Sequence, residues 1–120
     1  MIILGLDISS SRIGFCLINE KEDLLLVDEI KLKSSMSLED RADIFKQKMQ
    51  IIKEHSEVDY VFIEQPFMAF SGGKTTAATM AKLQRFNGMC SYVVHDLFSC
   101  TPNLLQANKA RGLVGLKIKR

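Results

Sequence analysis

The sequence predicts an α/β domain whose elements follow the order β-β-β-α-β-α-β-α, with a mixed five-stranded sheet flanked by helices. Three apolar segments separated by short polar turns open the chain, and two long amphipathic segments follow with an apolar strand-like segment between them. The 120 residues are typical of one domain, and 47% hydrophobic residues are enough to form a core. We therefore expect a single domain over residues 1–120.

The first three segments predict an antiparallel meander. "MIILGLDI" (1–8) is an apolar segment that predicts a strand buried on both faces except at Asp7. "SSS" predicts a turn and "RIGFCLI" (12–18) a strand that runs back. After the turn "NEKED", the segment "LLLVDEIKLK" (24–33) predicts the third strand.

A helix is predicted in "SSMSLEDRADIFKQKMQIIKEH" (34–55), with Ser37 as its N-cap and Asp40 completing a capping box. Helical spacing places five apolar side chains on one face. They are Leu38, Ala42, Phe45, Met49 and Ile52.

The rest of the chain predicts parallel strands joined by a second helix. "VDYVFIEQP" (58–66) reads as a strand that ends at Pro66, and because it follows a helix it should lie parallel to the first strand. "TTAATMAKLQRFNGMCSYVVHDLF" (75–98) predicts the second long helix. A short strand near Ser99–Thr101 and a final helix from about Asn103 complete the expected fold.

The composition excludes several classes of protein. The start has no basic segment before its short apolar run, and no other segment approaches 18 apolar residues, so we expect a cytoplasmic protein without a membrane partner. Cys16, Cys90 and Cys100 are odd in number and widely spaced, which favours reduced apolar residues over disulfides or a zinc site.

The charge is divided unevenly along the chain. Residues 1–64 hold 8 basic and 13 acidic residues, whereas residues 65–120 hold 8 basic residues and one acid. A basic half indicates a polyanionic partner such as nucleic acid, although a solvated face with a basic tail would have the same composition.

Two carboxylates stand where apolar strands are expected. Asp7 lies in the first strand and Glu64 at the end of the fourth, so parallel pairing at ~4.8 Å would bring them together. Two buried like charges repel each other, and a bound cation would reverse that cost. Oxygen ligands suit Mg²⁺ or Mn²⁺, which can activate water for phosphodiester cleavage. Each acid taken alone could equally be a turn or cap residue.

Three segments carry a resemblance when they are taken together: "GLDISSSRIGF", "VFIEQPFMAFSGGKTTAATMAKLQRFNGM" and the closing "ARGLVG". They resemble the RuvC-type Holliday-junction resolvases of the RNase H-like superfamily. The resemblance covers nearly the whole chain and is closest to the compact phage and viral members. It implies a metal-dependent endonuclease that nicks four-way junctions or other branched DNA, with Mg²⁺ (or Mn²⁺) held by the catalytic acids Asp7 and Glu64. It also implies a homodimer formed through the helix near 74–96.

The resemblance and the charge pattern suggest DNA contacts. Phe67 matches a family aromatic that stacks on exposed bases, although it could instead cover the core. Five cations could contact phosphates, and each could equally be a solvated surface charge. They are Lys74, Lys82, Arg85, Lys109 and Arg111.

The chain departs from the family pattern at its end. The family carries a further pair of acids in a "DxxDA"-like helix beyond "ARGLVG", whereas no acid follows Asp96 here. The resemblance therefore leads us to expect a chain truncated before its catalytic helix, and weak or absent activity of the 120 residues alone.

Two other functions remain open from the sequence. A non-catalytic branched-DNA-binding module would explain the missing acids. An actin-like or sugar-kinase-like ATP-binding fragment would also open with an Asp-bearing strand and a serine turn, but such proteins need two related domains. "SGGKTT" is not a phosphate-binding loop, because Met68 stands where that motif requires glycine.

Overall fold

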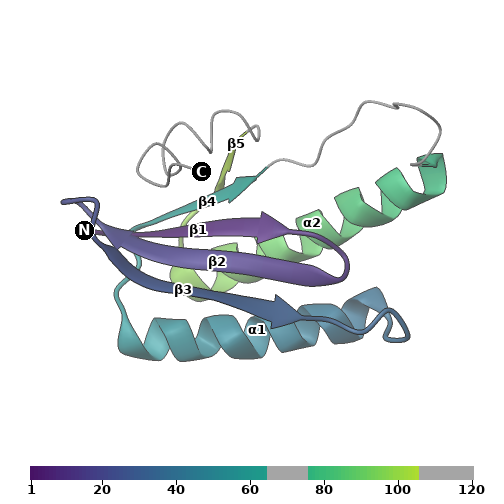
Figure 1. Cartoon of the computed structure of the whole chain (residues 1–120), viewed down its shortest axis with the longest axis horizontal. Helices are drawn as coiled ribbons and strands as arrows, with labels where there is room; N and C mark the ends of the chain where they lie inside the picture. Colours follow the sequence, from purple (N-terminus) through teal and green to yellow (C-terminus); the bar gives the residue numbers. More distant parts are fainter. Residues whose placement is uncertain (65–75, 106–120) are drawn as a thin grey trace.

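A mixed five-stranded sheet forms the centre of the computed structural model, which describes residues 1–64 and 76–105 (Figure 1). The strand order is β3-β2-β1-β4-β5, and β1 pairs antiparallel with β2 and parallel with β4. This confirms the predicted meander and the predicted crossover. The elements are β1 (Ile2–Ile8), β2 (Arg12–Asn19), β3 (Leu24–Lys31), α1 (Leu38–His55), β4 (Tyr60–Glu64), α2 (Ala77–Phe98) and β5 (Asn103–Leu105).

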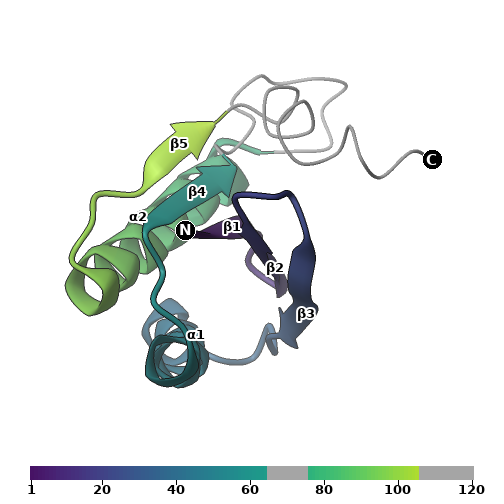
Figure 2. The same ribbon diagram turned by 90° about the vertical axis from the view of Figure 1, so that its left-hand side faces the viewer.

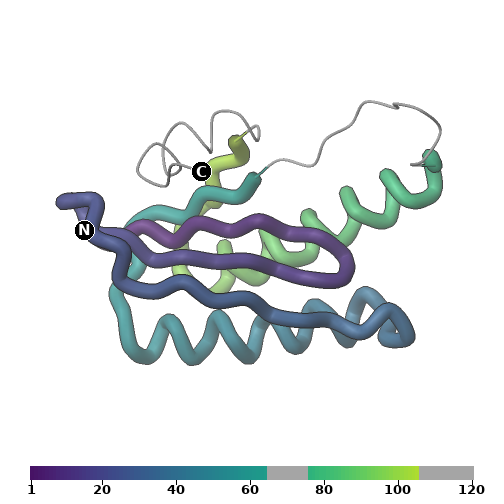
Figure 3. The backbone as a smooth tube through the Cα atoms, viewed as in Figure 1, coloured from purple at the N-terminus to yellow at the C-terminus, as the bar shows by residue number. Residues whose placement is uncertain are grey.

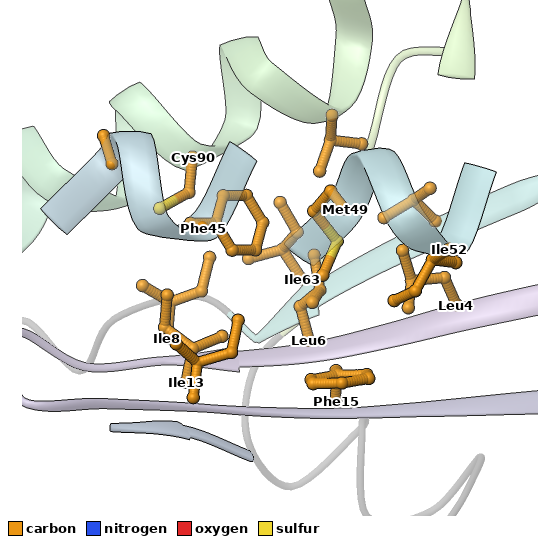
Figure 4. Packing of buried hydrophobic residues seen from close by; sticks show 14 of the residues in the cluster. Leu4, Leu6, Ile8, Ile13, Phe15, Phe45, Met49, Ile52, Ile63 and Cys90 are labelled. Carbon is orange, nitrogen blue, oxygen red and sulfur yellow. The ribbon is translucent and has the colours of Figure 1, made fainter. Parts of the chain in front are cut away.

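Both described helices cover the same face of the sheet (Figure 2). Their apolar side chains meet those of the central strands in one core, in which Phe45 and Met49 of α1 are fully buried (Figure 4). Alternate residues of β1 and β2 supply the sheet's side of this core. They are Leu4, Leu6, Ile8, Ile13, Phe15 and Leu17.

The prediction that β1 is buried on both faces is wrong for the described part of the chain. Leu4, Leu6 and Ile8 are buried, but Ile3 and Gly5 are only partly buried and Asp7 is exposed. The reason is that both described helices lie on one side of the sheet. We call the other side the open face; on the three central strands it carries Ile3, Gly5, Asp7, Gly14, Cys16, Ile18, Tyr60, Phe62 and Glu64.

The chain's last described strand differs from the prediction. β5 occupies Asn103–Leu105, where a final helix was expected to begin, and Ser99–Thr101 form no strand. Parallel pairing with β4 explains the difference, because Phe62 lies opposite Asn103 and Glu64 opposite Leu105. The rest of the expected helix lies outside the described residues.

Side-chain caps begin both helices. The Ser37 hydroxyl accepts a hydrogen bond from the Asp40 backbone N–H at 3.0 Å, which confirms the predicted N-cap of α1. Thr76 caps α2 in the same way, accepting from Thr79 at 3.1 Å. At its other end α2 stops at Ser99, whose left-handed backbone (φ 56°) cannot continue a helix.

The strand β3 lies at one edge of the sheet and carries an unusual apolar run. Leu24, Leu25, Leu26 and Val27 are 40% to 61% exposed, although they are consecutive in one strand. The charged residues Asp28 and Glu29 follow directly.

No helix in the described part of the chain is long and apolar enough to cross a membrane.

The three cysteines are free thiols. Cys90 of α2 is fully buried, and burial raises its pKa to about 12. Cys16 and Cys100 are partly exposed, and burial raises the pKa of each of these as well. The thiols therefore behave as small apolar side chains, as the sequence predicted.

Candidate functional site

The ends of two parallel strands bring Asp7 and Glu64 together. The register between β1 and β4 pairs Leu6 with Ile63, so Asp7 and Glu64 occupy the next positions of the two neighbouring strands. Leu6 and Ile63 both point into the core. Because side chains alternate along a strand, Asp7 and Glu64 both face the open side, on strands ~4.8 Å apart.

The exposure of Asp7 contradicts the expectation that both acids are buried. Asp7 is exposed and Glu64 is only partly buried, so the two acids are not a pair of dry carboxylates that repel each other in the core. Asp7 keeps its hydration and needs no cation to offset burial. What remains is the arrangement itself, with two carboxylates at adjacent strand ends on one face.

The carboxylates of Asp7 and Glu64 are the type of ligand that a hard divalent cation prefers, but they are only two. Carboxylate oxygens on rigid strands suit Mg²⁺ or Mn²⁺, which retain several waters and need few protein ligands. Within residues 1–64 and 76–105, however, no group of three or more His, Cys, Asp or Glu residues could hold a metal ion. Among the described residues, Asp7 and Glu64 could thus supply at most two ligands, and substrate oxygens and water would have to complete such a site.

The β2 and β3 strands extend a row of residues across the open face from Asp7. Gly14 is directly opposite Asp7, and Glu29 is directly opposite Gly14. Two positions back along β2, Arg12 pairs with Lys31 and its Nε lies 3.5 Å from a carboxylate oxygen of Glu29. Arg12 and Glu29 were not predicted from the sequence, in which the signal for this row is a glycine in the middle of a strand pattern.

The serine turn after β1 is closed by its own residues. The backbone N–H and the hydroxyl of Ser9 both donate to the Arg12 carbonyl, at 2.9 and 2.7 Å. The Ser9 hydroxyl also accepts from the Arg12 N–H at 3.1 Å. Figure 3 shows how this turn joins β1 and β2 into one long hairpin. The strand register places Asp7, opposite Gly14, close to the closed end of this hairpin.

A buried arginine anchors the same turn to the rest of the domain. Arg41 of α1 is 2% exposed and donates hydrogen bonds to three carbonyls. Its Nη1 donates to Ser10 at 2.8 Å, its Nη2 to Ser34 at 2.8 Å and its Nε to Met36 at 3.0 Å. The Leu32 N–H adds a bond to the Ser11 carbonyl at 2.9 Å. Both central carbonyls of the turn are therefore held from outside it.

Two of the other predicted contact residues, Lys82 and Arg85, do not join this site. Lys82 and Arg85 are exposed on α2, a helix on the side of the sheet opposite the open face. Arg85 lines an open hollow of ≈ 570 Å³ between α1 and α2, together with Glu39, Asp43 and Tyr92. The hollow is therefore a separate feature from the Asp7 site. Four predicted residues lie outside the described part of the chain: Phe67, Lys74, Lys109 and Arg111.

Comparison with known proteins identifies the architecture. No protein-family model matches the sequence, and no curated protein matches it. Among solved structures, T. thermophilus RuvC in complex with a Holliday junction substrate is similar, with a TM-score of 0.76 and 11% identity, over 99% of this chain and 73% of that chain. Another Thermus thermophilus RuvC structure is similar with a TM-score of 0.68 and 13% identity, over 98% of this chain and 82% of that one. The chain therefore has the RuvC-type, RNase H-like fold that its sequence predicted.

Proposed function

We propose that this chain is a divalent-metal-dependent endonuclease domain that acts on four-way junctions or other branched DNA. The observation that carries the proposal is the placement of Asp7 and Glu64 at adjacent parallel strand ends, on one face of a RuvC-type fold. The excess of basic residues after residue 64 supports a polyanionic substrate. The complex of the similar RuvC structure with a Holliday junction substrate favours branched DNA.

In this proposal Asp7 and Glu64 hold a Mg²⁺ or Mn²⁺ ion on the open face. Such an ion supplies a polarised phosphate and a more acidic water. The rigid ends of β1 and β4 orient the two carboxylates, and the anchored serine turn keeps Asp7 in place. With only two carboxylates we expect weak ion binding and slow cleavage by the 120 residues.

We further propose a homodimer formed through α2. Ala77, Ala78, Ala81 and Gly88 are exposed on this helix, and side chains this small allow close approach of a second helix. A two-fold dimer would match the two-fold symmetry of a four-way junction and would present one site to each of two strands. Sedimentation of the chain with and without Ala81→Arg tests this contact, and an unchanged monomer mass for both proteins would contradict it.

Binding and nicking assays test the nuclease proposal. The unmodified chain should bind four-way junctions more tightly in Mn²⁺ than in EDTA, and should nick them slowly. Asp7→Asn and Glu64→Gln should abolish both effects, whereas Asp43→Asn, an exposed acid on the helix side, should abolish neither. Metal-independent binding that Asp7→Asn leaves unchanged would contradict the proposal.

The second candidate is a branched-DNA-binding module without catalysis. The absence of a three-acid cluster among residues 1–64 and 76–105 favours it. It predicts tight junction binding in EDTA and no nicking in Mg²⁺ or Mn²⁺. The same assays therefore separate the two candidates.

A further inference from the structure

Gly14 is a glycine that neither its backbone nor its packing requires. Its φ lies outside the left-handed region that favours glycine, and a Cβ at this position would meet no atom within 4 Å. Gly5, on the same face, differs because a Cβ there would lie 3.1 Å from the Cys16 sulfur. A glycine inside a strand costs about 0.5–1 kcal/mol relative to alanine, so the fold would be more stable with a side chain at position 14.

The position of Gly14 suggests what the missing side chain would obstruct. Gly14 is directly opposite Asp7, and directly opposed residues of antiparallel strands have Cβ atoms about 4.5–5.5 Å apart. A valine at position 14 would therefore stand beside the Asp7 carboxylate on the open face. A glycine in a strand often marks a place where a ligand comes close to the backbone.

A positively charged side chain, that of Arg12, lies two positions from Gly14 on the same strand. The Arg12 side chain is 63% exposed and forms an ion pair with Glu29 at 3.5 Å, and Glu29 is itself 41% exposed. An ion pair this exposed contributes little to stability, so Arg12 can exchange Glu29 for another anion at small cost. Lys31, directly opposite Arg12, adds a second exposed positive charge.

We propose that Gly14 and Arg12 form the path by which the DNA backbone reaches Asp7. Gly14 keeps the surface beside the carboxylate clear, and Arg12 contacts a phosphate of the strand that passes over it. The inference rests on the proposed nuclease function and extends it to two residues on β2. It assigns them separate roles, clearance for Gly14 and phosphate contact for Arg12.

Two variants test these roles by different readouts. Gly14→Val is judged by the ion-dependent part of junction affinity, which is the ratio of the Kd in EDTA to the Kd in Mn²⁺, and Arg12→Gln by junction affinity and its salt dependence. Gly14→Val should melt no lower than the unmodified chain, because valine is a better strand residue. It should nevertheless lower the ion-dependent ratio toward one, because a valine side chain beside Asp7 would obstruct the close approach of the DNA backbone. Arg12→Gln should melt unchanged, weaken junction binding several-fold and lower its salt dependence by about one phosphate contact.

Matched controls separate these roles from general effects of bulk and charge. Val27→Phe adds bulk to the same face beside Cys16, one strand further from Asp7, and Lys48→Gln removes a charge on the helix side. Val27→Phe should not change the ion-dependent ratio, and Lys48→Gln should change neither junction affinity nor its salt dependence. If the unmodified chain binds and Gly14→Val and Arg12→Gln bind equally well, the inference is wrong and the nuclease proposal stands. If the unmodified chain has no ion-dependent junction binding, the nuclease proposal fails and this inference fails with it.

Discussion

Replacing Arg41 with methionine should lower the free energy of unfolding by about 2–4 kcal/mol. Arg41 is 2% exposed, and the three hydrogen bonds of its guanidinium, of 2.8 to 3.0 Å, would all be lost. Each carbonyl left without a donor costs about 1–3 kcal/mol when buried. The lower part of that range applies here, because Ser10, Ser34 and Met36 are only partly buried or exposed and water can replace some of the lost donors.

Urea unfolding at neutral pH measures the loss caused by Arg41→Met. Arg41→Lys keeps the charge but cannot reach three carbonyls at once, so it should lose somewhat less than Arg41→Met. Lys46→Met, an exposed cation on the same helix, should change the unfolding free energy by less than about 0.5 kcal/mol. A loss below about 1 kcal/mol for Arg41→Met would refute the reasoning, since it would mean that the turn relaxes or hydrates without cost.

Three further predictions concern the cap, the core and a buried thiol. Ser37→Ala should cost about 1 kcal/mol in urea unfolding by removing the N-cap of α1; Ser37→Asp should restore most of the loss. Phe45→Ala should cost about 3–5 kcal/mol, because Phe45 is fully buried, and a smaller loss would mean that the core collapses around the gap. Burial raises the Cys90 pKa from 9.0 to about 12, so the stability due to its neutral thiol is complete below pH 9 and is lost as the pH rises toward 12. Between about pH 9 and pH 10 the unmodified chain should therefore lose roughly 1 kcal/mol more unfolding free energy than Cys90→Ala, and equal losses would contradict this account.

The regular elements were readable from the sequence because local signals determine them. Alternating apolar residues, the serine turn and the cap at Ser37 predicted β1 to β3 and α1. The short strand β5 was misplaced because pairing with β4 determines it, and that partner lies about 40 residues earlier in the chain. The exposure of Asp7 was missed for a related reason. An apolar strand does not reveal which of its faces the helices will cover.

The candidate site was predicted only in part. Asp7 and Glu64 could be paired from the sequence, since a helix between two strands predicts parallel neighbours with adjacent ends. The role of Arg41 could not be predicted, because a lone arginine on a helix usually faces water and its three carbonyl partners come from two different loops. The sequence shows that residue 14 is a glycine, but its position opposite Asp7 depends on the strand register.

The exposed run of β3 has a consequence for how the protein behaves at high concentration. An edge strand with free backbone groups and apolar side chains can pair with the edge of another molecule and so begin aggregation. In the described part of the chain β3 is an edge strand and its run Leu24–Val27 is apolar and exposed, and the acids Asp28 and Glu29 directly after it limit how far a second strand could extend. These two acids therefore act as gatekeepers of solubility, and their replacement by apolar residues should make the chain precipitate at lower concentration.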